Sequence, residues 1–159
     1  MSLRRLSPVV LAFAALSATA AGVTVTYAPT ARHADAGSGP AQIEANLAEL
    51  AAHLQGLGQR LLAADDALEV EIVDLDLAGE LRPSRRGSDL RVLRGGADWP
   101  RITLRYRFSK AGQAQEPRAE ALSDMNYLMQ VGRLAASDPL YYEKRMLDDW
   151  FRARFVPPQ

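Results

Sequence analysis

Carboxylate side chains are concentrated in residues 68–81, which read LEVEIVDLDLAGEL. Asp74, Asp76 and Glu80 offer hard oxygen ligands of the type that calcium and magnesium ions prefer. The same groups could act as the acid and the base of a hydrolase, since glycoside hydrolysis uses two such carboxyl groups. One hypothesis is therefore a metal-dependent or acid/base hydrolase centred on Asp74, Asp76 and Glu80.

Motifs for other chemistries are incomplete in this sequence. Residues 74–85 match three positions of a calcium-binding EF-hand loop, but Ala78 and Arg85 stand at two positions that need oxygen ligands. His33 and His53 have no G-x-S-x-G motif near them, so nothing indicates a serine triad. No glycine-rich segment leads into the lysine-bearing helix start of a phosphate-binding loop. The sequence therefore predicts no cofactor.

Arginines dominate the segment that follows, residues 82–94, which is also rich in turn-forming residues. A guanidinium group can donate two parallel hydrogen bonds to a carboxylate or a phosphate, so these side chains could bind an anionic partner. The segment lacks the interleaved aromatic residues that stack on bases, and we expect no nucleic-acid partner. The candidate binding residues are Arg82, Arg85, Arg86, Arg91 and Arg94.

The acidic segment is also a strong candidate for a β-strand. Its apolar residues alternate with acidic ones, as in a strand with one buried face, but the alternation changes parity between Ile72 and Val73. A β-bulge at these two residues would return the apolar side chains to a single face. Four carboxylates would then share the opposite face: Glu69, Glu71, Asp74 and Asp76.

A second strand of opposite charge is predicted at residues 101–108, RITLRYRF, whose polar face carries Arg101, Arg105 and Arg107. The charges also segregate along the sequence: residues 40–81 contain nine acids and one base, and residues 82–118 contain ten bases and three acids. Opposite charges on neighbouring strands contribute about 0.2–1 kcal/mol per pair. We therefore expect the two strands to pair and their charges to neutralise one another.

Two elements are predicted before the acidic strand. Residues 23–27, VTVTY, alternate valine and threonine as a first strand would. Pro40 begins a helix with Ser38 or Gly39 as its cap, and its apolar residues recur every three or four positions as far as Leu61. This single apolar stripe predicts a helix packed on a sheet.

The second half of the chain predicts a hairpin and a last helix. Residues 118–122 can return beside the basic strand, and Ser123 can cap a helical turn. Asp138 followed by proline begins the last helix, in which Lys144 and Asp148 are spaced for an ion pair. The fold class predicted is α+β, a two-layer sandwich with a mainly antiparallel sheet of four to five strands and two principal helices on one face.

The N-terminal sequence predicts export. Arg4 and Arg5 precede an apolar run that is shorter than the roughly 20 residues needed to cross a bilayer and is followed by small residues. Residues 1–20 are therefore expected to be a signal peptide, and residues 23–156 a single domain without a transmembrane anchor. The chain has no cysteine, so it is not expected to be a lipoprotein, and the predicted location is periplasmic or secreted.

Four segments together resemble a known family. They are DLDLAGE from Asp74, ADWPRITLRY from Ala97, LSDMNYL from Leu122 and DPLYYEKRMLDDWF from Asp138. The chain resembles a bacterial family of small exported proteins, domain of unknown function family 3016. The resemblance implies an exported, single-domain protein, and it supplies no established activity and no catalytic residue to carry over.

The favoured hypothesis is a non-enzymatic binding or scaffolding module of the cell envelope. Its partner would be an envelope protein or an anionic envelope component, held by the arginines of residues 82–94. The hydrolase centred on Asp74, Asp76 and Glu80 is the alternative. The sequence predicts neither an oligomeric state nor a particular ligand.

Overall fold

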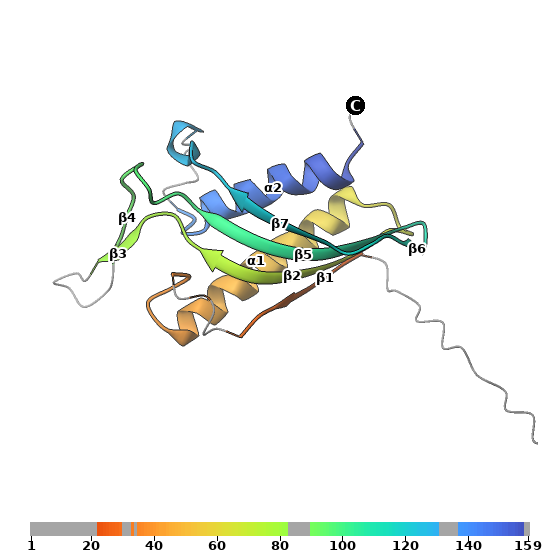
Figure 1. Cartoon of the computed structure of the whole chain (residues 1–159), viewed down its shortest axis with the longest axis horizontal. Coiled ribbons are helices and arrows are strands. Elements are labelled where there is room, and N and C mark those ends of the chain that lie inside the picture. The colour runs from red at the N-terminus through yellow and green to blue at the C-terminus, as the bar shows by residue number, and fades with distance from the viewer. Residues whose placement is uncertain (1–21, 30–32, 34, 83–89, 131–136, 158–159) are drawn as a thin grey trace, which may run out of the picture.

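The computed structural model describes residues 22–29, 33, 35–82, 90–130 and 137–157. The predicted signal peptide lies outside these residues. In the described part of the chain, a sheet of five strands carries both helices on one face, and a separate ribbon of two strands extends beyond one end of the sheet (Figure 1). The predicted α+β architecture is confirmed. None of the helices in the described ranges is long and apolar enough to cross a membrane.

The main sheet has mixed strand directions. The first strand β1 (Gly22–Tyr27) pairs in parallel with β2 (Ala67–Asp76), because the helix between them carries the chain back across the sheet. Strand β2 pairs antiparallel with β5 (Arg101–Lys110), which in turn pairs with the short β6 (Gln113–Ala114) and with β7 (Arg118–Ser123). The return strand predicted at residues 118–122 is confirmed.

The two helices share one hydrophobic core with the sheet. Helix α1 (Pro40–Leu61) begins at the predicted proline, with Gly39 as its cap, and α2 (Tyr141–Phe155) begins after the Asp138 turn. Side chains of both helices pack in one cluster on the apolar faces of β2 and β5. Gly58 allows α1 to approach β1 closely, since a Cβ at this position would lie 2.2 Å from Cγ2 of Val23.

The predicted bulge is confirmed. The pairing of β2 with β5 shifts register between Ile72 and Asp74, and Ile72 and Leu75 are both buried on the helix side. Three of the four acidic residues of β2 then lie opposite basic residues of β5, and the fourth, Asp74, lies opposite Thr103. Three ion pairs result: Asp76 with Arg101 at 2.8 Å, Glu71 with Arg105 at 2.6 Å, and Glu69 with Arg107 at 3.8 Å.

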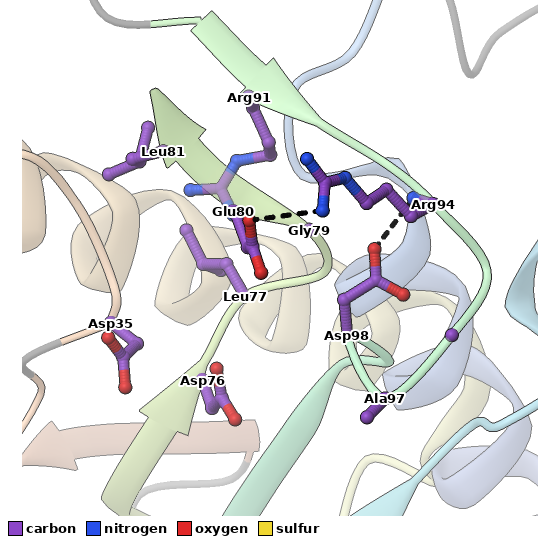
Figure 2. A pocket seen from close by; sticks show the side chains of 11 residues that line it. Asp35, Asp76, Leu77, Gly79, Glu80, Leu81, Arg91, Arg94, Ala97 and Asp98 are labelled. Carbon is purple, nitrogen blue, oxygen red and sulfur yellow. Dashed lines mark hydrogen bonds and ion pairs between the residues drawn. The ribbon is translucent and has the colours of Figure 1, made fainter. Parts of the chain in front are cut away.

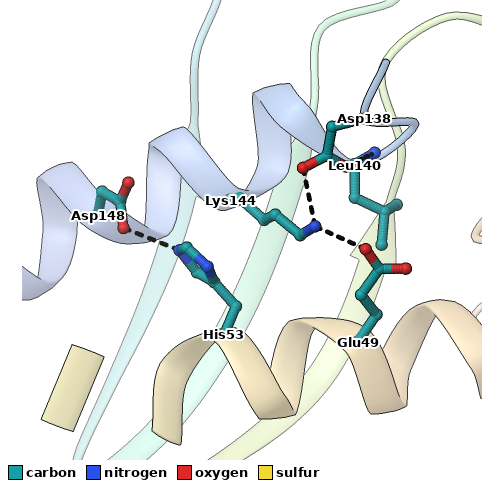
Figure 3. Close-up of polar contacts among 6 residues, drawn as sticks. All are labelled: Glu49, His53, Asp138, Leu140, Lys144 and Asp148. Carbon is teal, nitrogen blue, oxygen red and sulfur yellow. Dashed lines mark hydrogen bonds and ion pairs between the residues drawn. The ribbon is translucent and has the colours of Figure 1, made fainter. Parts of the chain in front are cut away.

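Polar contacts between α1 and α2 differ from the expected pairing within α2. Nζ of Lys144 lies 2.6 Å from Oε1 of Glu49 and 2.8 Å from Oδ2 of Asp138 (Figure 3). Oδ1 of Asp148 accepts a hydrogen bond of 2.8 Å from Nε2 of His53. Burial lowers the pKa of Lys144, but the hydrogen bonds to the two carboxylates outweigh it and leave the pKa raised. These side chains therefore join the helices to one another.

The cap of the turn after β7 also differs from the predicted one, Ser123. Ser123 is the last residue of β7, and it is Asp124 whose Oδ1 accepts the backbone N–H of Asn126 at 3.0 Å. The helical turn itself is a short 3₁₀ segment, Tyr127–Gln130. An aspartate performs this role as well as a serine does, because each presents an oxygen acceptor to the free N–H groups of the turn.

Candidate functional site

The candidate site lies beside the two-stranded ribbon. Strand β3 (Glu80–Arg82) pairs antiparallel with β4 (Leu90–Val92), separately from the main sheet. Gly79 joins β2 to β3 with a φ of 82°, and a Cβ there would lie 2.7 Å from the backbone oxygen of Val92. Glycine therefore satisfies both the left-handed backbone and the close approach of β4 at this joint.

An open cavity of about 700 Å³ lies between the ribbon, the end of β2 and residues 94–98. Its lining includes six charged side chains that come from four separate segments of the chain: Asp35, Asp76, Glu80, Arg91, Arg94 and Asp98. Figure 2 shows Arg91 and Arg94 on the ribbon side of this space and Asp35 with Asp76 on the other side. The cavity therefore has walls of opposite charge.

Two of the cavity carboxylates already have partners. Oε2 of Glu80 lies 3.1 Å from Nη2 of Arg82 and 3.9 Å from Nη1 of Arg94. Oδ2 of Asp98 accepts the backbone N–H of Arg94 at 2.7 Å (Figure 2). Burial raises the pKa of Asp98, but hydrogen bonds led by the one from the Arg94 backbone outweigh it, so the pKa is lowered. The contact with Asp98 stabilises the loop of residues 94–98, and Glu80 already has a guanidinium partner in Arg82.

Arg91 differs from Arg82 and Arg94 because it has no ion-pair partner among the described residues. Its cross-strand neighbour is Leu81 rather than an acid, and its Nη1 donates to the backbone oxygen of Ala78 at 2.7 Å. Within the described residues, no carboxylate lies at ion-pair distance from its guanidinium. The other half-buried arginine, Arg145, has Asp124 at 4.0 Å. Arg91 therefore retains guanidinium donors for a ligand.

The lowered pKa of Arg91 is consistent with a half-buried guanidinium group that has no direct ion pair among the described residues. Partial burial lowers the pKa, while the negative charges of Glu143 and Asp76 act through space to raise it and only partly offset the burial. A desolvated cation without a direct partner is costly, and an anion placed beside it recovers the lost interaction. Arg91 is therefore our candidate for the anion-binding group of the cavity.

Asp76 and Asp35 form the opposite wall. Asp76 is half-buried at the end of β2 and shares its charge with Arg101, whereas Asp35 is exposed. The backbone oxygen of Asp35 accepts the N–H of Leu77 at 3.4 Å, which keeps this loop against the end of β2. Burial raises the pKa of Asp76, and the nearby charge of Asp35 adds to the rise against the lowering effect of Arg101.

Glu143 supports the joint behind Arg91. It is 1% exposed, and its Oε1 accepts the backbone N–H of Ala78 at 2.7 Å, the residue whose oxygen receives Arg91. Its Oε2 is buried without a hydrogen-bond partner among the described residues. Burial raises the pKa of this carboxyl group despite the backbone hydrogen bonds. Glu143 thus fixes Ala78 and, through it, the position of Arg91.

The carboxylates of the hydrolase hypothesis do not converge. Asp74 is exposed, its Oδ1 accepts its neighbour Leu75's N–H at 3.0 Å, and it is not part of the cavity lining. Asp76 and Glu80 do line the cavity, each with an arginine partner. Across the described ranges, no group of three histidine or acidic side chains is arranged to hold a metal ion.

The arginines of the binding hypothesis are placed differently from one another. Arg91 and Arg94 line the cavity, and Arg82 is at the end of β3, outside the lining, in an ion pair with Glu80. Arg85 and Arg86 lie outside the described residues. The structure therefore brings two of the five predicted arginines together at one cavity.

Three residues of the site were missed in the sequence. Asp35 and Asp98 sit in loops whose packing depends on distant segments, and nothing local marks them. Glu143 did carry a signal, because it falls in the apolar stripe of the last helix, four positions before Leu147 and seven before Trp150, where a charge must be buried. A charged residue on a core-facing position could have been identified from that spacing.

The described geometry can be compared with known proteins. No curated protein matches the chain, and no solved structure does so. One family model, described as a protein of unknown function (DUF3016), matches residues 21–153 of the 159-residue chain. The match covers the sheet, the ribbon, the cavity and nearly all of α2. The chain therefore belongs to this family, domain of unknown function family 3016.

Proposed function

We propose that this protein is exported to the cell envelope and acts there as a non-enzymatic binding module, with Arg91 holding an anionic group of an envelope component. The observation that carries the proposal is the half-buried Arg91 guanidinium, which lines a cavity of about 700 Å³ without an ion-pair partner in the described part of the chain. Such a group gains more from an anion than an exposed arginine does, because it has already lost part of its hydration.

Two further observations support binding rather than hydrolysis. Asp76 and Glu80 are engaged with arginines, and Asp74 faces solvent away from the cavity, so the three carboxylates have no common substrate position. The site is held by backbone contacts at Ala78 and Gly79, which pre-organise Arg91 for its ligand. A pre-formed site with one strong anion contact suits recognition.

Export is supported by the pattern of residues 1–20, and the family match begins immediately after the predicted cleavage site at Ala20. A chain with a C-terminal tag, expressed in a bacterium and fractionated by osmotic shock, tests this part. We expect a product shortened by the predicted segment in the periplasmic or secreted fraction. A full-length product confined to the cytoplasm would contradict export.

Binding is tested with simple anions and two matched variants. Acetate and inorganic phosphate are titrated into the mature chain while backbone and arginine side-chain NMR signals are followed. We expect the largest shifts at Arg91, Ala78 and Gly79, their loss in Arg91→Gln, and their retention in Arg105→Gln. Arg105 is a suitable control because it is exposed and already paired with Glu71. Shifts that persist in Arg91→Gln would contradict the assignment of this site.

A further inference from the structure

When the ion pairs and hydrogen bonds within the cavity are taken into account, charges of both signs remain. Glu80 has Arg82 as its nearest partner, with Arg94 at 3.9 Å, and Asp98 accepts the backbone N–H of Arg94 within its own loop. Among the described residues, Arg91 has no acid at ion-pair distance on the ribbon side. On the other side, Asp35 has no base at ion-pair distance in the same described ranges, and it lies next to Asp76, which is paired with Arg101. After these cancellations the cavity is dipolar.

The two charged walls face each other without touching. Asp76 acts on Arg91 through space, and Asp35 acts on Asp76 in the same way, but neither acid is in contact with the Arg91 guanidinium. Figure 2 shows the two aspartates across the open space from Arg91. A ligand that occupies this space therefore meets a cation at one end and carboxylates at the other.

This arrangement discriminates among small ligands. A simple anion bound at Arg91 is opposed by the field of Asp35 and Asp76, and a simple cation bound at the aspartates is opposed by Arg91. A molecule that carries both charges satisfies both walls, and in a partly enclosed site each contact is stronger than it is in bulk water. The charges favour a zwitterion over either ion alone.

We propose that the cavity binds a zwitterionic ligand with a carboxylate at Arg91 and an ammonium group at Asp35 and Asp76, the chemistry of a free amino acid or a short peptide. This inference rests on the proposed function, because it takes Arg91 as the anion contact. It adds the ligand class and assigns a binding role to Asp35, which the sequence did not indicate.

The positions of the two aspartates suit an ammonium group. Asp35 is held by the Leu77 N–H at its backbone oxygen, and the next residue, Ala36, accepts the Asn46 side-chain amide at 2.7 Å. Burial and the charge of Asp35 raise the pKa of Asp76. An ammonium group placed between them would lower that pKa again, so binding should release protons at a pH near the Asp76 pKa.

Calorimetric titration of the mature chain at constant ionic strength tests the inference with four probes. Glycine and alanyl-alanine represent an amino acid and a peptide, succinate is a dianion, and 1,4-diaminobutane is a dication. We expect one of the zwitterions to bind at least about ten-fold more tightly than succinate or the diamine. The stronger of the two identifies the size of the ligand.

Three variants separate the two walls. Asp35→Asn should weaken the zwitterion and leave succinate unchanged or stronger, while Arg91→Gln should weaken both. Asp149→Asn, an exposed acid of α2 outside the cavity lining, should change neither. Asp35 is exposed, so its substitution is not expected to disturb folding, and an unchanged thermal midpoint verifies this.

The possible results distinguish this inference from the proposed function. Succinate binding as tightly as the zwitterions, dependent on Arg91 and independent of Asp35, would overturn the zwitterion and leave the anion site standing. Binding of the diamine alone would overturn both. If none of the four probes binds in the millimolar range, the zwitterion inference is wrong, whatever acetate and phosphate show at Arg91.

Discussion

The outer face of the main sheet and the ribbon end use the same residue types with different outcomes. On the sheet, Glu71 of β2 lies opposite Arg105 of β5, and the pair closes at 2.6 Å. On the ribbon, Arg91 of β4 lies opposite Leu81, and among the described residues the acids that act on it through space, Glu143 and Asp76, belong to other segments. Register therefore decides whether an arginine is neutralised locally or stays available.

We interpret this difference as one between charges with a structural role and the binding group proposed at Arg91. The pairs Glu71–Arg105 and Glu69–Arg107 lie on the open face of the sheet, where each acid is neutralised by its arginine, so an external ion has little to gain there. The ribbon strands have three residues each and leave one half-buried guanidinium directed at a cavity. High charge density by itself does not indicate a site, and the unpaired, partly desolvated charge does.

The largest predicted effect comes from placing a carboxylate on the core face of β2 just after the bulge. Leu75 is 1% exposed on the helix side, so Leu75→Asp would bury a carboxylate among the apolar side chains of the core. Each buried, unpaired carboxylate costs several kcal/mol, against a total stability of about 5–15 kcal/mol for a domain. We expect the variant to lose cooperative unfolding, as measured by circular dichroism during urea titration.

The control for this substitution is Val73→Ala, a change in the same strand at a residue outside the core cluster. Val73 is half-buried, so a loss of about 1 kcal/mol or less is expected for this substitution. A Leu75→Asp variant that unfolds cooperatively at the midpoint of the unmodified protein would show that the bulge does not turn Leu75 towards the core.

Local patterns were sufficient to predict the sheet. The parity change at Ile72 and Val73 indicated the bulge, and alternating arginines identified the strand that pairs with the acids. The spacing of leucines after Pro40 predicted α1. These features follow from periodicities of two and of three to four residues, which are properties of neighbouring positions and can be seen without the tertiary structure.

The cavity could be predicted only in part. Arg91 and Arg94 were candidates, but their sequence gave no reason to separate them from Arg82, which is paired. Asp35 reaches the cavity because its loop packs on the end of β2, some forty residues away in the sequence. The pairing of Lys144 with Glu49 rather than with Asp148 has the same cause. Contacts between distant segments depend on how the layers pack.

The second prediction compares a carboxyl group behind the ribbon with one at the sheet edge. Burial raises the pKa of Glu143 above its ordinary 4.5, so the folded chain holds this proton more tightly than the unfolded chain does. Stability must then fall as pH rises from about 4.5 through the folded pKa. Glu143→Gln cannot ionise at this position, so we expect it to be more stable than the unmodified protein at neutral pH.

Glu120 on β7 supplies a control, because its pKa is shifted in the opposite direction. Burial raises its pKa, but hydrogen bonds from Tyr106 and Arg154 outweigh this and leave the pKa lowered. Glu120 therefore adds stability above its ordinary pKa of 4.5 and loses it as pH falls. Urea midpoints between about pH 3 and pH 7 should show Glu143→Gln gaining on the unmodified protein as pH rises and Glu120→Gln losing. Parallel curves for the two variants would contradict the assigned signs.

The smallest predicted effect measures the charge pairs of the two regions directly. A double-mutant cycle on Glu71 and Arg105, with glutamine at each position, should give a coupling free energy of about 0.2–1 kcal/mol that decreases with added salt. The same cycle on Glu80 and Arg94 should give a coupling close to zero, because these side chains lie 3.9 Å apart, are half exposed, and Glu80 keeps Arg82 as a nearer partner.

The difference between the two cycles decides what Arg94 does. If Glu80 and Arg94 couple as strongly as Glu71 and Arg105, the ribbon neutralises its charges as the sheet does, and Arg94 is a structural residue. A coupling near zero leaves the Arg94 guanidinium able to turn towards a carboxylate held by Arg91, because both arginines line the same cavity. The cycle on Glu80 and Arg94 should then change when it is repeated in saturating alanyl-alanine, whereas the cycle on Glu71 and Arg105 should stay constant.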